Sequence, residues 1–147
     1  MDSLIKTLHQ HYKNLDSIYN NYAKENGLSV SSFWILYSIV QSESPLTQSE
    51  MINIWTFTQQ TVNTSLKNLE KDGLIEFKTS SENKKNKYIY LTKAGKELSE
   101  KIINPFIQAE KSAAEKFSPE MKNLYAEFIK NHFEYLSESL KNNHPEV

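Results

Sequence analysis

The sequence predicts a mainly α-helical fold with one small β-hairpin. Glycine is scarce, with three in 147 residues, and apolar residues recur every three or four positions through most of the chain. A single segment, residues 74–92, has the period of two that is typical of strands. With 38% hydrophobic and 24% charged residues, the chain is neither disordered nor membrane-spanning. We therefore expect one domain over 1–147 with a real core.

Two helices are expected before residue 42. Residues 3–24 form the first, and Asn26-Gly27 ends it. Its apolar stripe steps by three and four through Leu8, Tyr12, Leu15, Tyr19 and Tyr22. Ser29 can cap the second helix, which is apolar nearly all round from Phe33 to Val40 and so belongs in the centre of the fold.

A short capped helix is the clearest local signal. Thr47 and Glu50 form a capping box, flanked by Leu46 and Met51 at the positions of a hydrophobic staple. This helix should run from Gln48 to about Trp55. A second one follows, capped by Thr58, buried along Val62, Leu66 and Leu69, and ended at Asp72-Gly73.

The period then changes. Residues 74–79 and 87–92 alternate around a polar, basic segment, which predicts a hairpin with a long charged tip. Thr92 caps a helix that begins at Lys93, and Asn104-Pro105 should kink or break it. Ser118-Pro119 starts a last helix that ends near Lys141, with an apolar stripe at Tyr125, Ile129, Phe133, Leu136 and Leu140.

This order of elements is that of a winged helix-turn-helix, in which one helix enters the major groove and the hairpin reaches an adjacent phosphate or the minor groove. Amides suit adenine, a threonine methyl suits thymine, and lysines suit phosphates. An ordinary solvated helix face is the alternative. The candidate DNA-binding residues are Thr47, Thr58, Gln59, Gln60, Thr61, Asn63, Thr64, Lys67, Lys84, Lys85 and Lys87, with Lys71 further along the same face.

Charge is unevenly distributed. The chain has a net charge of −1, and all 17 of its basic residues are lysine. Residues 63–103 nevertheless hold nine lysines and six acids, while the segments on either side are each net negative. Positive charge is therefore concentrated on the predicted helix and hairpin, where phosphate binding needs it.

The segment from Leu46 to Gly95 resembles the MarR family. The similarity rests on residues 46–51, on Thr61-Val62-Asn63, and on the pair Leu-Glu-x-x-Gly-Leu-Ile (69–75) and Leu-Thr-x-x-Gly (91–95). The flanking helices fit by position and length. The resemblance implies a homodimer whose terminal helices form the interface, and repression or activation at palindromic sites, often relieved by a small ligand.

The chain departs from this family at two places. MarR proteins usually carry Asp-x-Arg in the wing, where this chain has Asn83-Lys84-Lys85, and relatives often have arginine where Thr64 stands. Lysine lacks the planar fork of arginine, so wing contacts should be less sequence-selective. We therefore predict an A/T-rich palindromic operator with few required G·C pairs.

Homodimerisation is expected because the stripes on the first and last helices need a partner. We assign 1–28 and 104–147 to dimerisation helices and 29–103 to a DNA-binding lobe. The alternative is an intramolecular helical pair that covers the core. Two joined reading heads would place their recognition helices about 34 Å apart on one face of DNA.

Aromatic side chains outside the reading helix suggest a pocket for a flat aromatic or acyl ligand, lined by Tyr12, Tyr19, Trp34, Tyr37 and Trp55. Ordinary core packing is the alternative for these rings. His9, His11, His132 and His144 show no metal-ligand spacing, and cysteine is absent, so neither a metal nor a cofactor is expected.

No catalytic motif is recognisable, so an enzyme is not expected. No signal peptide precedes the first helix, and the apolar run 33–40 is too short to span a bilayer, so we expect a cytoplasmic protein without a membrane partner. A DNA-binding regulator is the reading we favour. A winged-helix protein-interaction module, with lysines that only solubilise it, is the alternative.

Overall fold

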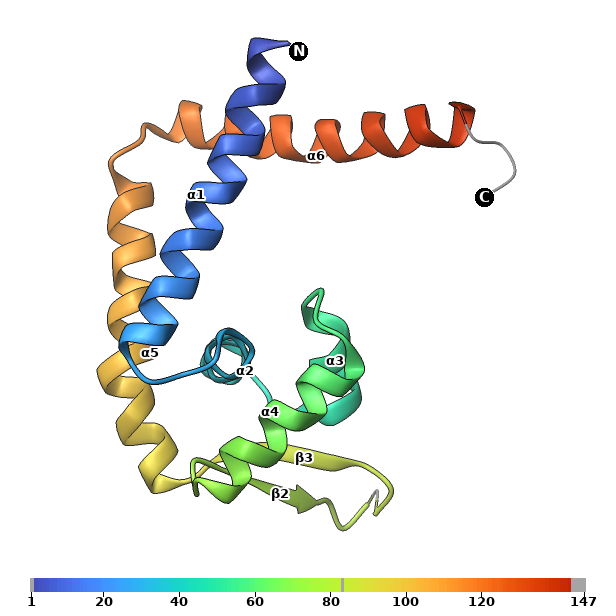
Figure 1. Cartoon of the computed structure of the whole chain (residues 1–147). Helices are drawn as coiled ribbons and strands as arrows, with labels where there is room; N and C mark the ends of the chain where they lie inside the picture. Colours follow the sequence, from blue (N-terminus) through green and yellow to red (C-terminus); the bar gives the residue numbers. More distant parts are fainter. Residues whose placement is uncertain (1, 83, 144–147) are drawn as a thin grey trace. The chain divides into compact units, whose positions relative to one another are not determined.

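The computed structural model describes residues 2–82 and 84–143, which fall into two compact units, Met1–Pro105 and Phe106–Val147. The predicted mainly α-helical fold with a small hairpin is confirmed (Figure 1). The first unit holds α1 (Ser3–Glu25), α2 (Val30–Gln41), β1 (Leu46–Thr47), α3 (Gln48–Ile54), α4 (Gln59–Lys71), β2 (Ile75–Thr79), β3 (Lys87–Leu91) and the first part of α5 (Lys93–Glu115).

Short polar side chains set where the helices of the first unit begin. The amide of Ser32 donates to the Ser29 hydroxyl at 3.1 Å, and the amide of Gly95 donates to the Thr92 hydroxyl at 3.0 Å. These caps satisfy amides that the first turn of a helix leaves without partners. Asp2 caps α1 in the same way, through a 2.7 Å bond from the amide of Leu4.

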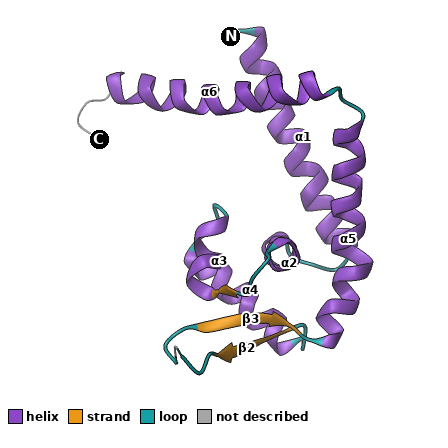
Figure 2. Cartoon of the chain, turned by 180° about the vertical axis from the view of Figure 1, so that it is seen from behind, coloured by secondary structure: helices purple, strands orange, loops and turns teal. Residues whose placement is uncertain are grey.

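The sheet has three strands rather than the two of a simple hairpin. Its order is β1-β3-β2 and both pairs are antiparallel, with Leu46 opposite Ile89 and Phe77 also opposite Ile89. Figure 2 shows β2 and β3 side by side, joined by the loop at the wing tip. β1 was not predicted, because two residues are too few to show an alternating pattern.

The core of the first unit is centred on α2, as its all-round apolar character predicts. Phe33, Ile35 and Leu36 are almost fully buried, together with Met51, Val62, Leu66, Leu69, Ile75, Ile89 and Ile103 from the surrounding elements. The hydroxyl of Tyr22 donates to the carbonyl of Ile102 at 2.8 Å and so joins α1 to α5. Partial burial raises the pKa of this hydroxyl.

Of the kink or break expected at Asn104-Pro105, the break does not occur. α5 runs without interruption from Lys93 to Glu115, with Pro105 inside it. Proline removes the hydrogen bond to the carbonyl four residues earlier, which here belongs to Lys101. Lys101, Asn104 and Pro105 are all exposed, so the carbonyl that loses its partner lies on the solvent side of the helix, where water can pair it.

The second unit contains the end of α5 and helix α6 (Pro119–Asn143). Ser118 caps α6 as predicted, accepting from the amide of Met121 at 3.2 Å. No residue of this helix is buried, although its apolar stripe is conspicuous. Among residues 2–82 and 84–143, the helices lack the length and continuous apolar character that crossing a membrane requires.

Candidate nucleic-acid interface

Helix α4 is held with one fixed face outward. Thr58 caps it, accepting from the amide of Thr61 at 3.1 Å, and Gly73 ends it with a positive φ of 71°. Val62, Leu66 and Leu69 are buried against the core, as predicted. A buried hydrogen bond of 2.6 Å joins the hydroxyls of Ser31 on α2 and Ser65 on α4. The helix therefore cannot rotate without losing both apolar contacts and this bond.

The opposite face of α4 carries amides, hydroxyls and lysines. A shallow groove of about 570 Å³ runs along it, lined by Gln59, Gln60, Asn63, Thr64 and Lys67. Asn63 is half-buried, while the other four are exposed. The hydroxyl of Thr58 also donates to that of Thr61 at 2.9 Å, so these two candidates already use part of their polar capacity within the helix start. The structure thus brings five of the α4 candidates to one surface, while Thr61 contacts Thr58 at the start of the helix.

Thr47 is occupied by the capping box at the start of α3. Its amide and hydroxyl both donate to the Glu50 carboxylate, at 2.7 and 2.9 Å, and the Glu50 amide donates to the Thr47 hydroxyl at 3.2 Å. The bond from the backbone amide and that from the hydroxyl lower the pKa of Glu50. The predicted capping box is confirmed.

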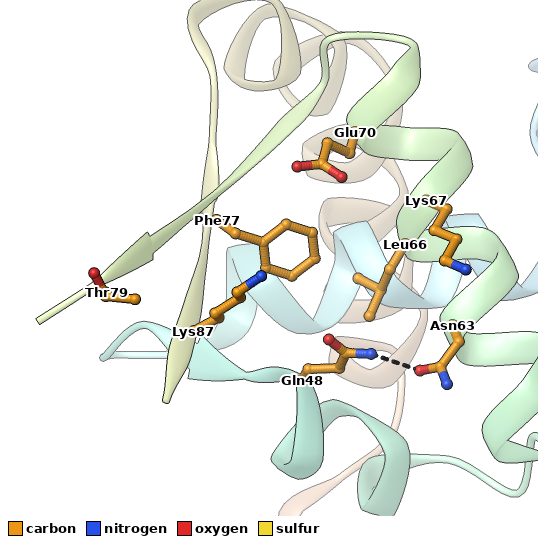
Figure 3. A pocket seen from close by; sticks show the side chains of 8 residues that line it. All are labelled: Gln48, Asn63, Leu66, Lys67, Glu70, Phe77, Thr79 and Lys87. Carbon is orange, nitrogen blue, oxygen red and sulfur yellow. Dashed lines mark hydrogen bonds between the residues drawn. The ribbon is translucent and has the colours of Figure 1, made fainter. Parts of the chain in front are cut away.

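A cleft separates α4 from the sheet, with a volume of about 590 Å³ (Figure 3). Leu66 and Phe77 form its apolar floor, while Lys67 and Lys87 stand on opposite walls with Glu70 nearby. Within it the Gln48 carboxamide donates to the Asn63 oxygen at 2.7 Å. Gln48, Glu70 and Phe77 were not predicted as site residues, because Gln48 and Phe77 belong to other elements than α4 and no local pattern indicates that these elements meet it.

The wing carries further lysines besides the one that lines the cleft. Lys84, Lys85 and Lys87 are exposed, whereas Asn83 lies outside the described residues. Lys78, on the other side of β2, pairs with Glu76 at 2.7 Å, and this contact raises the pKa of Lys78. Its ammonium also lies 5.2 Å from the centre of the Tyr90 ring. The wing therefore carries four exposed lysines, of which Lys78 is paired with Glu76.

Four of the five candidate ligand residues contact one another around Trp34. Its ring centre lies 4.9 Å from that of Tyr19, 5.0 Å from that of Tyr37 and 4.4 Å from that of Trp55. Tyr12 is 52% exposed, with its ring 6.2 Å from that of His11. Trp55 donates to the Ser38 hydroxyl at 2.7 Å, and Ser38 donates to the Trp34 carbonyl at 2.8 Å.

Metal-ligating side chains do not gather in the part of the chain that the structure describes: no group of three or more His, Cys, Asp or Glu could hold an ion there. His9 and His11 lie on α1, and His132 stacks on Phe128 of α6 with ring centres 5.7 Å apart. His144 falls outside the described residues.

Comparison with known proteins identifies the same fold in characterised regulators. The sequence profile of the MarR family matches residues 26–85. A MarR family transcriptional regulator from Listeria monocytogenes, solved in complex with 26mer DNA, is 28% identical over 97% of this chain and 95% of its own, with a TM-score of 0.69. No curated protein matches the sequence.

Two further structures share the fold at lower identity. S. aureus MepR in its DNA-binding conformation has a TM-score of 0.76 at 18% identity, over 92% of this chain and 99% of its own. MarR from Oenococcus oeni PSU-1 has a TM-score of 0.71 at 16% identity, over 90% and 99%. Together with the profile match and the motifs at 69–75 and 91–95, these findings place the chain among transcription regulators rather than enzymes. The chain is thus similar to the MarR family of winged helix-turn-helix transcriptional regulators, whose profile matches residues 26–85 and whose solved members share its fold.

Proposed function

We propose that this protein is a homodimeric repressor that binds an A/T-rich palindrome in the bacterial cytoplasm, with α4 in the major groove. The observation that carries the proposal is the outer surface of α4, where amides and hydroxyls gather near the start of the helix and lysine follows. An α-helix is about 10–12 Å across with its side chains, which fits a major groove about 12 Å wide.

The absence of arginine supports an A/T-rich operator. Guanine is most often read by a bidentate arginine or lysine, and lysine lacks the fork that makes such contacts selective. Gln59, Gln60 and Asn63 instead offer the carboxamides that pair with adenine, and Thr64 offers a methyl group for thymine.

The wing is proposed to position the protein on the backbone. Lys84, Lys85 and Lys87 are exposed and contribute charge without a planar hydrogen-bonding pattern. Lys67 and Lys87 both line the cleft between α4 and the sheet, so recognition helix and wing can each contribute phosphate contacts there. Such contacts strengthen binding to all sequences alike.

Helix α6 is proposed to form the dimer interface with a second copy of itself. Its exposed apolar side chains are Met121, Leu124, Tyr125, Ile129, Phe133, Tyr135, Leu136 and Leu140. A soluble monomer rarely exposes so continuous an apolar stripe. A two-fold dimer presents α4 twice, which would account for a palindrome, and a dimer bound there would block other proteins from the same DNA.

Release by a flat aromatic or acyl ligand is proposed at the aromatic cluster. Tyr37 and Trp55 line a pocket of about 280 Å³ with Leu46 and Ile54, and Trp55 ends α3 just before the turn that leads to α4. A ligand that displaces Trp55 would therefore move the recognition helix. Quenching of tryptophan fluorescence by such ligands, together with loss of DNA binding, is the expected response.

DNA binding is tested by titrating the protein onto duplexes of its own upstream region at two salt concentrations. Affinity should fall steeply with salt, because bound phosphates release counterions. Gln60→Ala and Asn63→Ala should lower discrimination between operator and scrambled duplex more than they lower scrambled binding. Lys67→Ala should lower the affinity for both duplexes and reduce the slope of log affinity against log salt concentration by about one. Lys111→Ala, an exposed lysine in the second unit, is the matched control. A G·C-rich palindrome from selection, or no protected sequence in dilute buffer, would overturn the proposal.

The dimer is tested by Phe133→Asp, since Phe133 is the most exposed apolar residue of α6 at 71%. Sedimentation should show a dimer for the wild type and a monomer for this variant, because a buried charge at the centre of an apolar interface is strongly unfavourable. Lys141→Asp introduces the same residue on the same helix away from the stripe and should remain dimeric. A wild-type monomer at micromolar concentration would refute the arrangement.

A further inference from the structure

We propose that Gln48, at the start of α3, is a positioning residue that determines which base Asn63 reads. The inference rests on the proposed DNA binding through α4 and deepens it. Its basis is the 2.7 Å bond from the Gln48 carboxamide nitrogen to the Asn63 carboxamide oxygen, drawn as a dashed line in Figure 3.

Gln48 stands on a rigid support. It is the first residue of α3, directly after Thr47, whose amide and hydroxyl are held by Glu50. Thr47 is also paired with Tyr88 in the β1–β3 ladder. The backbone that carries Gln48 is thus fixed from the helix side and from the sheet side, so its carboxamide approaches Asn63 from a defined direction.

Asn63 needs such a partner to present one orientation. The last torsion of an asparagine side chain is broad and roughly two-fold, so a solvated carboxamide exchanges its oxygen and nitrogen ends easily. With the nitrogen of Gln48 at its oxygen, Asn63 must direct its own nitrogen away from Gln48. Gln59 and Gln60 on the same helix are exposed and lie outside the cleft where this bond forms.

The fixed orientation distinguishes adenine from guanine. Adenine offers a donor, its amino group, beside the acceptor N7, whereas guanine offers two acceptors, O6 and N7. The second lone pair of the Asn63 oxygen accepts from the adenine amino group while its nitrogen donates to N7. Guanine would instead place O6 against the Asn63 oxygen. If the carboxamide were free to turn over, it could offer its nitrogen to O6 and guanine would be tolerated better.

Substitution of Gln48 separates this role from a structural one. Gln48→Met keeps the length and removes the donor. It should reduce adenine-over-guanine discrimination by about tenfold at the base pair that Asn63→Ala identifies, which is part of what a good bidentate contact provides. Binding to scrambled duplex and its salt slope should stay within about twofold, because Gln48 carries no charge. Ser49→Ala, an exposed neighbour on α3, is the matched control and should change neither.

Gln48→Glu provides the opposite test. A carboxylate only accepts, so Asn63 must turn its nitrogen toward residue 48 and its oxygen outward. The Asn63 nitrogen then lies where it can donate to O6 of guanine but opposes the adenine amino group, while the oxygen faces N7 of either purine. Adenine should therefore lose its preference over guanine at that one position, measured relative to scrambled duplex to remove the effect of the added charge. A change confined to a single position is not an effect that loss of stability produces.

Three results would overturn the inference. The first is that Gln48→Met retains full discrimination at the base pair read by Asn63; this result would leave the proposed function intact. The second is that Gln48→Met lowers the affinity for scrambled and operator duplexes equally and also lowers the unfolding temperature, which would make the role of Gln48 structural. The third is that Gln48→Glu retains the adenine preference. Failure of the wild type to bind any duplex would instead refute the proposed function itself.

Discussion

The last residue of the Leu-Thr-x-x-Gly motif is Gly95, the third residue of α5, and only glycine fits there for steric reasons. It is buried, and a Cβ added there would fall far inside contact distance of the Leu74 carbonyl oxygen and 2.9 Å from its carbonyl carbon. The Leu91 side chain lies 3.3 Å away on another side. Because the principal obstacle is backbone, no side chain can swing aside, and Gly95→Ala must push the start of α5 away from Leu74.

The cost of this shift can be worked from the contacts it disturbs. Forcing an extra methyl group into packed structure costs about 3 kcal/mol when the backbone has to move. The Thr92 amide donates to the Leu74 oxygen at 3.1 Å and the Thr92 hydroxyl to the Gly73 oxygen at 2.6 Å, and weakening both costs about 1 kcal/mol each. Alanine recovers about 1 kcal/mol through its higher helix propensity. Gly95→Ala should therefore destabilise the protein by about 4 kcal/mol.

Urea denaturation followed by circular dichroism, at a fixed protein concentration, measures this loss. Gly73→Ala is the matched control. Gly73 has a positive φ of 71° and nothing within 4 Å of an added Cβ, so its substitution should cost only the conformational strain of about 1 kcal/mol. The steric explanation is wrong if the free energy of unfolding of Gly95→Ala lies within about 1 kcal/mol of the wild-type value. It is also wrong if Gly73→Ala lowers the free energy of unfolding by more than its expected conformational strain.

Three further substitutions test other parts of the molecule. Trp55→Phe should lower the free energy of unfolding in urea by about 1–2 kcal/mol, because it leaves the Ser38 hydroxyl, in a residue only 7% exposed, without its donor. Adding Ser38→Ala should recover part of this loss, whereas losses that simply add in the double variant would contradict the bond. Glu50→Ala should lower the unfolding temperature at pH 7, and this loss should shrink as the pH falls below 4.5. The folded pKa of Glu50 lies below its ordinary 4.5, so its contribution is present above pH 4.5 and is lost as pH falls through the lower folded value; a gap independent of pH would contradict this. Glu70→Gln removes a negative charge from the cleft lined by Lys67 and Lys87. The affinity for scrambled duplex in low salt should therefore rise about twofold to fivefold. An unchanged affinity would show that no DNA phosphate lies near this cleft.

Local chemistry made most of the fold predictable. Ser29, Thr47, Thr58 and Thr92 each mark a helix start through a bond that spans only three residues, so the signal lies entirely within the nearby sequence. The spacing of apolar residues likewise identifies the buried side of α4. The face of α4 proposed to bind DNA follows, since a helix with a known buried side has a known exposed one.

Features that depend on distant residues were not predictable. β1 exists because Leu46 and Thr47 meet a strand more than forty positions later. Pro105 suggested an interruption, yet the solvent-facing position that makes a proline tolerable is a tertiary property. The bond between Gln48 and Asn63 spans 15 positions and joins two helices, so neither residue alone indicates it. The sequence also grouped Tyr12 with the Trp34 cluster, although no local rule distinguishes an exposed stripe tyrosine from a packed one.

Thr47 connects the elements that the proposed interface uses. It pairs with Tyr88 in the sheet, caps α3, and precedes the residue that contacts Asn63 on α4. The wing strand, the supporting helix and the recognition helix are therefore linked through one short segment in addition to their packing contacts. A displacement of α3 relative to the sheet would disturb the orientation of Asn63 and the cleft between Lys67 and Lys87 together. This linkage implies that sequence discrimination and backbone affinity should weaken in parallel in variants that loosen Thr47, whereas Gln48→Met should separate them.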